Sequence, residues 1–340
     1  MKSTKRRTTQ IGNKIIGKNH RVLIQTMPTA KTSNAKEVIK QIKECEQYGL
    51  DLIRVSIVDL DDVKALNKIK VAIKVPLIVD LHFDKKLALL SMDQEIDKIR
   101  INPVNLKKES DYIEIIEKAR DKSLPVRLGF NEGSIPNIDD MLKTAEHYIE
   151  LANQHGFDDF VLSFKFSNVA KTIEVYEKAY KLFPHPLHLG VTESGIKDIG
   201  LIKSSCALAP LLVKNIGDTI RISLTDKSVE EVKAARRLLK SLDLDHDWPE
   251  LISCPSCGRS EVSVVKVAKE ISEFLEKNKI NLKVAIMGCP VNGPGEAKAA
   301  DIGIAGSKNN TWILFKHGKI IRTIDGTNII EDFKNEIKKL

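Results

Sequence analysis

Three cysteines near the end of the chain have a spacing that suits a metal centre. Cys254 and Cys257 form a C-x2-C pair, Cys289 follows after 31 intervening residues, and each lies beside Gly or Pro. An iron–sulfur cluster held by three thiolates and one weaker ligand fits this set, and Glu296 is the candidate for a labile oxygen ligand. A four-ligand zinc site completed by His317 is an alternative. A simple redox pair is disfavoured, because no thioredoxin-like βαβ start precedes it.

A second set of polar side chains occurs at the ends of predicted strands. Its members are Arg54, Ser56, Asp80, His82, Arg100, Asn102, Arg127, Asn131, Lys165, His188, Thr192, Glu193, Arg221 and Ser223. The cations outnumber the acids, so ion pairs such as Asp80 with Arg54 or Arg100 can satisfy only some of them. Arginine presents a planar fork that suits phosphate oxygens. We also expect Lys203, Ser204 and Ser205 to open a helix whose amides favour an anion. The set therefore predicts a phosphate or diphosphate site.

Alternating strands and helices must position these side chains. Between residues 22 and 243, short apolar runs rich in Val, Ile and Leu alternate with helical segments eight times, as in buried parallel sheets. Strands are expected at 22–27, 52–57, 76–83, 98–103, 125–130, 160–166, 186–192 and 219–225. This pattern predicts an α/β fold, a (β/α)8 TIM-like barrel with its site at the carboxyl ends of the strands. A doubly wound sheet is the alternative, but no Gly-rich loop follows the first strand.

A different pattern follows a linker at 246–249. It contains a Cys-bearing loop at 253–259, a helix at 263–278, strands at 282–287, 302–305, 312–316 and 319–324, and a helix at 329–340. We therefore expect a small α+β cluster domain at 246–340, after a substrate-binding barrel at 22–245 and an N-terminal β-hairpin at 1–21.

The net charge says little about a nucleic-acid partner. The 340 residues carry 54 Lys+Arg and 46 Asp+Glu, a formal charge of +8, and seven of the basic residues lie in the acid-free segment 1–21. Turns around Ile15 and Ile16 favour a hairpin there over a transit peptide or a nucleic-acid-binding arm. No apolar run approaches the ~18 residues of a membrane span. We expect a cytoplasmic protein that binds neither nucleic acid nor membrane.

The two remaining cysteines are interpreted as core residues. Cys45 lies on the apolar stripe of one predicted helix, and Cys206 lies in another helix with Ala207, Leu208 and Leu211. Free cysteines in such positions behave as small buried hydrophobes.

Five motifs together resemble the GcpE/IspG family of 4-hydroxy-3-methylbut-2-enyl diphosphate synthases, in its short bacterial form. They are DLHFD at 80–84, HLGVTESG at 188–195, GDTIRISL at 217–224, SCPSCGR at 253–259 and MGCPVNGPGE at 287–296. The resemblance covers nearly the whole chain from residue 7 onward. The departures from the family's usual residues are Val104, Glu132, Pro210 and Pro290, and we expect Glu132 to place an acid beside Arg127 and Asn131.

The resemblance implies the reductive ring opening and dehydration of 2-C-methyl-D-erythritol 2,4-cyclodiphosphate in the non-mevalonate isoprenoid pathway. It implies a 4Fe–4S cluster with the ligands Cys254, Cys257, Cys289 and Glu296. The implied substrate-binding residues are Arg54, Asp80, His82, Arg100, Arg127, Asn131, Lys165, Lys203, Arg221, Ser223 and Arg259, and the implied catalytic residues are Glu193, Glu296 and His82. It further implies a homodimer, with the barrel of one chain facing the cluster domain of the other, and electrons from flavodoxin or ferredoxin.

Two functions of other classes remain open from the sequence. One is a zinc-dependent barrel hydrolase that uses the three cysteines and His317. The other is a non-catalytic RNA-binding protein that uses residues 1–21, whose binding would weaken steeply with salt.

Overall fold

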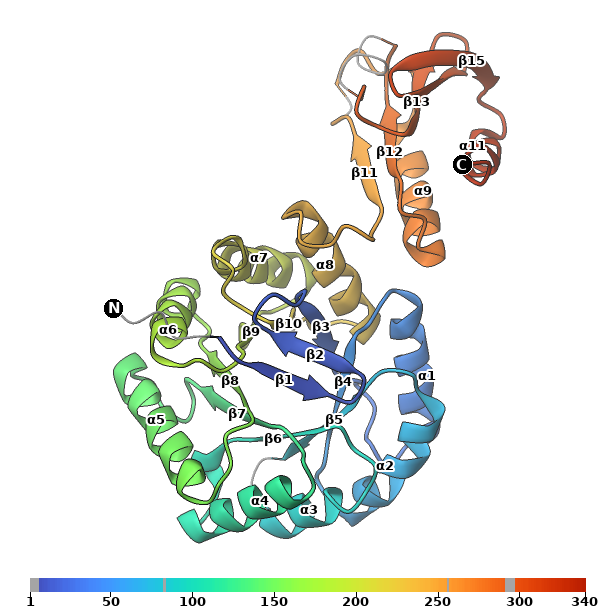
Figure 1. Cartoon of the computed structure of the whole chain (residues 1–340). Coiled ribbons are helices and arrows are strands. Elements are labelled where there is room, and N and C mark those ends of the chain that lie inside the picture. Colours follow the sequence, from blue (N-terminus) through green and yellow to red (C-terminus); the bar gives the residue numbers. More distant parts are fainter. Residues whose placement is uncertain (1–5, 82–83, 256, 291–296) are drawn as a thin grey trace. The chain divides into compact units, whose positions relative to one another are not determined.

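The computed structural model describes residues 6–81, 84–255, 257–290 and 297–340, and the chain divides into two compact units, Met1–Leu244 and Asp245–Leu340. The first unit contains an eight-stranded parallel sheet surrounded by helices (Figure 1). Its strands are β3 (Leu23–Thr26), β4 (Leu52–Ser56), β5 (Leu77–Leu81), β6 (Lys98–Ile101), β7 (Val126–Asn131), β8 (Phe160–Lys165), β9 (His188–Gly190) and β10 (Thr219–Arg221). All eight lie within or overlap the predicted runs, so the predicted barrel class is confirmed.

The sheet follows the chain order and closes on itself. Its strand order is β8-β7-β6-β5-β4-β3-β10-β9, and a parallel bridge between Leu162 and Leu187 joins the two ends. The strands are almost wholly buried because helices cover the outside of the barrel, which explains their continuous apolar runs.

The barrel is surrounded by helices, several of which begin at side-chain caps. They are α1 (Ala35–Gln47), α2 (Leu60–Ala72), α3 (Lys85–Ser91), α4 (Glu109–Asp121), α5 (Ile138–Gln154), α6 (Val169–Leu182), α7 (Lys197–Val213) and α8 (Ser228–Ser241), with a 3-10 turn η1 (Pro103–Asn105). The side chains of Asp59, Asp84 and Asn137 accept backbone N–H bonds at the starts of α2, α3 and α5. In the described part of the chain, none of the helices is long and apolar enough to cross a membrane.

A short hairpin precedes the barrel. It consists of β1 (Thr8–Ile11) and β2 (Lys14–Gly17), which pair antiparallel. Ile11 and Ile16 are fully buried and share an apolar cluster with Leu23, Leu52, Ile78 and Val161. These four side chains lie in the amino-terminal halves of β3, β4, β5 and β8, so the hairpin covers the amino-terminal end of the barrel.

In its described residues, the second unit is a five-stranded mixed sheet with two helices. Its elements are β11 (Glu250–Ser253), α9 (Val264–Asn278), β12 (Lys283–Met287), β13 (Ile302–Ser307), β14 (Thr311–Lys316), β15 (Lys319–Asp325) and α11 (Ile329–Ile337). Strands β11, β12 and β13 run parallel, and β14 and β15 add antiparallel. The predicted α+β class is confirmed, but β11 was not expected, because three of its residues lie between the predicted linker and the predicted cysteine loop and Ser253 lies in that loop.

Helix α7 corrects two expectations. It begins at Lys197, so Lys203 lies in its second turn, and the prediction that Lys203, Ser204 and Ser205 open the helix is wrong. Cys206 is exposed on the outer side of α7, so its prediction as a core residue is also wrong, whereas Cys45 is buried as expected. Burial raises the pKa of the Cys45 thiol to about 12.

Candidate functional site

Strand register gathers charged side chains inside the barrel. Ser56 on β4 is in register with Asp80 on β5, Asp80 with Arg100 on β6, and Arg100 with Arg127 on β7. Paired residues of adjacent parallel strands share one face of a sheet. Asp80, Arg100 and Arg127 are therefore neighbours across three strands, and all three are buried.

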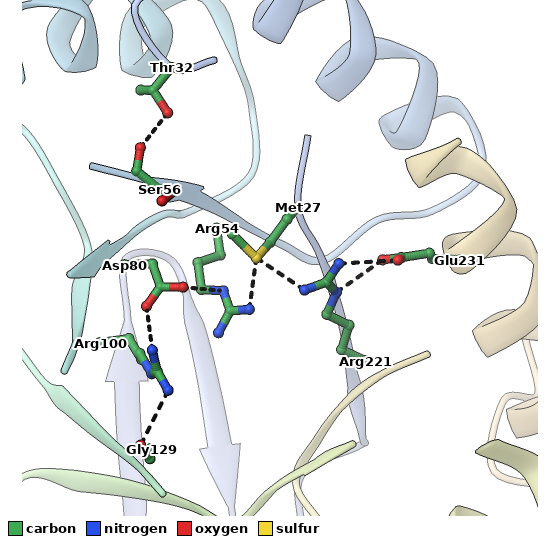
Figure 2. A network of polar contacts seen from close by, with 9 residues as sticks. All are labelled: Met27, Thr32, Arg54, Ser56, Asp80, Arg100, Gly129, Arg221 and Glu231. Atoms are coloured by element: carbon green, nitrogen blue, oxygen red, sulfur yellow. Dashed lines mark hydrogen bonds and ion pairs between the residues drawn. The ribbon is translucent and has the colours of Figure 1, made fainter. Parts of the chain in front are cut away.

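Asp80 bridges two of the arginines, as Figure 2 shows. Its Oδ1 accepts from Arg100 Nη1 at 2.9 Å, and its Oδ2 lies 3.5 Å from Arg54 Nε. The sequence predicted both of these ion pairs as possible partners for Asp80. A single carboxylate thus offsets part of the charge of two guanidinium groups. Burial nevertheless lowers the pKa of Arg54 to about 10, with Asp80 opposing that effect and Arg221 adding to it.

Arg221 on β10 has a carboxylate partner that the sequence reasoning missed. Its Nε and Nη2 donate to Glu231 of α8 at 3.0 and 3.1 Å. Glu231 is buried and also accepts from the hydroxyl of Thr26 and the amide of Leu224. A signal was available, because Glu231 shares the buried face of its helix with Val232.

Met27 lies between two of the cations. Its sulfur accepts from Arg54 Nη2 at 2.7 Å and from Arg221 Nη1 at 3.0 Å (Figure 2). A thioether is a weak acceptor that carries no charge. The two guanidinium groups therefore converge on a point where an anionic oxygen would be held far more strongly.

Arg127 has less compensation than the other arginines. It is 1% exposed, and its Nε and Nη1 have no hydrogen-bond partner within the described residues. A guanidinium group cannot lose its proton in a protein, so burial without a partner leaves a strong demand for an anion. Neighbouring cationic side chains increase the positive electrostatic potential in the barrel interior. Burial, then the charges of Arg54 and Arg221, lowers the pKa of Lys165 well below its usual range.

His188 is the neutral member of this interior. Its Nδ1 lies 2.8 Å from the hydroxyl of Thr219, and burial followed by the charge of Lys165 lowers its pKa well below the usual value. It is therefore uncharged at neutral pH and adds no positive charge.

Two glycines leave room for the cations. A Cβ atom on Gly129 would lie 2.5 Å from Arg100 Nε, and one on Gly190 would lie 3.0 Å from Lys165 Nζ. Contacts this short force the neighbour to move, so the glycines on β7 and β9 allow the long side chains to lie flat across the barrel interior.

The other predicted site residues of the barrel are more dispersed. Asn131 accepts from the amide and hydroxyl of Ser134 at 3.0 and 2.8 Å, at the end of β7. Lys203 Nζ donates to the backbone oxygen of Glu193 at 3.0 Å, and Glu193 is exposed with a positive φ of 53°. Ser223 is partly buried just after β10. His82 lies outside the described residues.

Glu132 does not interact with Arg127 and Asn131 as the sequence suggested. Its carboxylate accepts from the amide and hydroxyl of Ser167 at 3.0 and 2.8 Å and lies 3.5 Å from Lys171 Nζ. The Glu132 carboxylate thus links the end of β7 to the start of α6.

In the second unit, two adjacent strands end beside the cysteines. Because β11 and β12 are parallel, with Ser253 in register with Ile286, Cys254 and Cys289 follow the carboxyl ends of neighbouring strands. Cys254 Sγ accepts from the amide of Gly288 at 3.0 Å. Cys257 is exposed, and the backbone N–H and then the side chain of Arg259 lower the pKa of its thiol.

The donor set fits an iron–sulfur cluster. Thiolates are soft ligands that such clusters prefer, and amide N–H bonds to sulfur, like that of Gly288, are a known means of tuning them. Among the described residues, no three His, Cys, Asp or Glu side chains are gathered as a metal site, and Glu296 lies outside those residues. Gly288 is needed where it is, because a Cβ there would lie 2.4 Å from Ser260 Oγ.

Similar solved structures share the barrel. A dihydropteroate synthase from Yersinia pestis matches with a TM-score of 0.53 at 16% identity, over 69% of this chain and 97% of that one. A truncated 3-deoxy-D-arabino-heptulosonate 7-phosphate synthase from Thermotoga maritima matches with a TM-score of 0.52 at 18% identity, over 70% and 94%. At this identity the likeness concerns the fold alone.

Sequence relatives match the whole length. A 4-hydroxy-3-methylbut-2-en-1-yl diphosphate synthase (flavodoxin) from Anoxybacillus flavithermus is 43% identical over 99% of this chain and 95% of its own. The enzyme of the same name from Bacillus subtilis is 43% identical over 98% and 91%. The GcpE TIM-barrel domain model matches residues 6–236, and the GcpE protein C-terminal domain model matches residues 250–339. Both units of the chain therefore belong to the GcpE family.

Proposed function

We propose that this chain is an iron–sulfur oxidoreductase that converts 2-C-methyl-D-erythritol 2,4-cyclodiphosphate into 4-hydroxy-3-methylbut-2-enyl diphosphate. The reaction opens the ring, releases water and consumes two electrons. Family membership and full-length relatives named for this product support it. The observation that carries it is the buried cationic interior of the barrel, above all Arg127, whose Nε and Nη1 have no partner among the described residues.

The barrel residues have separate roles in this proposal. Arg54, Arg100, Arg127, Lys165 and Arg221 bind the diphosphate and stabilise the charge that grows on its oxygen as the ring opens. Asp80 and Glu231 orient three of these arginines through the ion pairs described above. The further substrate contacts assigned here are His82, Asn131, Lys203, Ser223 and Arg259, and Glu193, His82 and Glu296 are the groups assigned to catalysis.

The cysteines of the second unit hold the cofactor. Cys254, Cys257 and Cys289 bind a 4Fe–4S cluster, and Glu296 is its fourth ligand. When bound, the cluster supplies electrons one at a time. The amide of Gly288 orients the Cys254 thiolate, and its bond to sulfur at 3.0 Å supports that assignment.

The same proposal covers the partners and the division of the chain. Electrons come from flavodoxin, the donor given in the names of the relatives, or from ferredoxin. The enzyme acts in the cytoplasm as a homodimer in which a barrel meets the cluster domain of a second chain. The functional parts are the hairpin at 1–21, the substrate barrel at 22–245 and the cluster domain at 246–340.

Anaerobically purified protein tests the proposal. We expect a brown protein with about four irons and four sulfides per chain that turns over the cyclic diphosphate with dithionite and a viologen mediator. Glu296→Ala should leave the barrel folded and abolish most turnover. Wild-type activity of that variant would refute the role of Glu296, and a colourless protein containing zinc would refute the function.

A further inference from the structure

Met27 lies within the cationic interior of the barrel although its side chain is neutral. It directly follows β3 and alternates with Leu23 and Gln25, so it faces the inside of the barrel. Its sulfur accepts from Arg54 Nη2 at 2.7 Å and from Arg221 Nη1 at 3.0 Å. Figure 2 shows the sulfur between the two guanidinium groups. The point at which both cations converge is therefore occupied by an uncharged atom.

Carboxylates hold both guanidinium groups from their other sides. Glu231 accepts from Nε and Nη2 of Arg221 at 3.0 and 3.1 Å, and Asp80 Oδ2 lies 3.5 Å from Arg54 Nε. In Figure 2 each guanidinium group has its carboxylate on one side and the Met27 sulfur on the other. Because Glu231 uses Nε and Nη2, Nη1 is the nitrogen of Arg221 that is best placed to bind a ligand. That nitrogen is the one that contacts Met27.

The main chain of Met27 is anchored, whereas its side chain is free to turn. The Met27 carbonyl accepts from the Ser228 hydroxyl at 2.6 Å, and the hydroxyl of Thr26 donates to Glu231. The methionine side chain is unbranched, has three rotatable bonds and is only partly buried here. The sulfur can therefore move aside while the main chain stays in place.

A bound anion and the sulfur compete for the same point. A thioether is a weak acceptor, whereas hydrogen bonds from guanidinium groups to phosphate oxygens are about twice as strong as neutral ones. A phosphate oxygen placed between Arg54 and Arg221 therefore displaces the sulfur. The free energy of binding is reduced by the two contacts that the sulfur loses, and the sulfur restores an acceptor to both cations once the anion leaves.

We propose that Met27 is an internal ligand of Arg54 and Arg221 that the diphosphate displaces when it binds. Met27 thus limits the affinity of the barrel for the diphosphate. The inference rests on the diphosphate site of the proposed function, and it adds to that site a residue that weakens binding.

Calorimetric titration of the anaerobic holoenzyme with inorganic pyrophosphate tests the competition. Met27→Leu keeps the size of the side chain but removes the acceptor, so pyrophosphate should bind about 10-fold more tightly, mainly because it dissociates more slowly. Met27→Gln introduces a stronger neutral acceptor of similar length, so pyrophosphate should bind about 10-fold less tightly. A packing role alone predicts no gain of affinity in Met27→Leu. Met141→Leu is the matched control, because Met141 is fully buried on α5 in the helix layer, and its affinity should not change.

Methyl resonances of methionine report the displacement directly. The chain has only five methionines, so a spectrum of protein labelled with ¹³C at the methionine methyl groups is simple. The Met27 resonance is identified by its loss in Met27→Leu. Saturating pyrophosphate should sharpen it and move it toward the position of a mobile methionine. The resonances of Met92 and Met141, which are buried, should stay where they are.

The outcomes separate this inference from the proposed function. An unmoved Met27 resonance at saturating pyrophosphate overturns the inference, and so does equal affinity of Met27→Leu and the wild type. A wild-type protein that does not bind pyrophosphate overturns it as well. Opposite changes of affinity in Met27→Leu and Met27→Gln, together with the displaced resonance, support it. The iron, sulfide and turnover assays described above test the function separately, because none of them depends on movement of Met27.

Discussion

Replacing Arg127 by Met should stabilise the substrate-free protein and weaken diphosphate binding. Arg127 is 1% exposed and its Nε and Nη1 lack partners within the described residues, so the folded state bears an uncompensated desolvation cost. That cost amounts to several kcal/mol for a buried ion, and an apolar side chain of similar length should recover about 1–3 kcal/mol of it. The same change removes two charge-assisted hydrogen bonds to a bound diphosphate, each worth about 1.5 kcal/mol or more. The affinity for pyrophosphate or cyclic diphosphate should therefore fall at least ~100-fold.

Urea unfolding followed by circular dichroism measures the first effect, and calorimetric titration with pyrophosphate measures the second. Circular dichroism is preferred because both tryptophans, Trp248 and Trp312, lie in the second unit. Pyrophosphate should raise the unfolding midpoint of the wild type and leave that of Arg127→Met unchanged.

Arg236→Met is the matched control. Arg236 is also buried, but its guanidinium donates to the Gly49 carbonyl at 3.1 Å and lies 3.4 Å from Asp51. Its loss should destabilise the protein by about 1–3 kcal/mol, since it removes a buried ion pair and a hydrogen bond although Asp51 keeps its contact with Arg21, and should not change pyrophosphate affinity. If Arg127→Met destabilises the anion-free protein as much as this control does, the reasoning about Arg127 is wrong.

Three further predictions concern other groups of the chain. Asp80→Asn should lower stability by about 3 kcal/mol, because two buried guanidinium groups lose their carboxylate, and added pyrophosphate should restore part of the thermal midpoint. Burial lowers the pKa of Lys98 to about 7, so the unfolded chain binds more protons between about pH 7 and pH 10. Stability should therefore rise with pH across that window, and the rise should be smaller in Lys98→Met when urea midpoints are compared, because buried Lys165 contributes in the same direction. Gly288→Ala should reduce iron and sulfide retention, because the new Cβ would lie 2.4 Å from Ser260 Oγ, whereas Gly258→Ala, with nothing within 4 Å, should retain both.

The barrel could be predicted because each strand repeats the same local signal. An apolar run bounded by turn residues can be recognised in the sequences of β4 and β8 without knowledge of the rest of the chain. Strand β11 was missed because only four residues form it and none is fully buried. Its position is set by pairing with β12, which is a non-local interaction.

The composition of the cationic site and the pairing of Asp80 could be predicted, but the pairing of Arg221 could not. The sequence shows that Arg54, Arg100 and Arg221 outnumber the nearby strand acids, yet it does not show that Glu231 reaches Arg221 from a helix. Cys206 was misplaced for a related reason. Helix α7 is apolar on both faces, so periodicity alone cannot tell the face that meets the barrel from the face that does not.

The hairpin β1–β2 closes the amino-terminal end of the barrel. Ile11 and Ile16 pack there against Leu23 and Leu52, so the proposed diphosphate ligand of Arg127 should enter and leave at the carboxyl ends of the strands. Product must then depart before the next substrate can enter. Slow release of the diphosphate product would therefore limit turnover. Accumulated product would act as a competitive inhibitor, because it would occupy the site that the substrate needs.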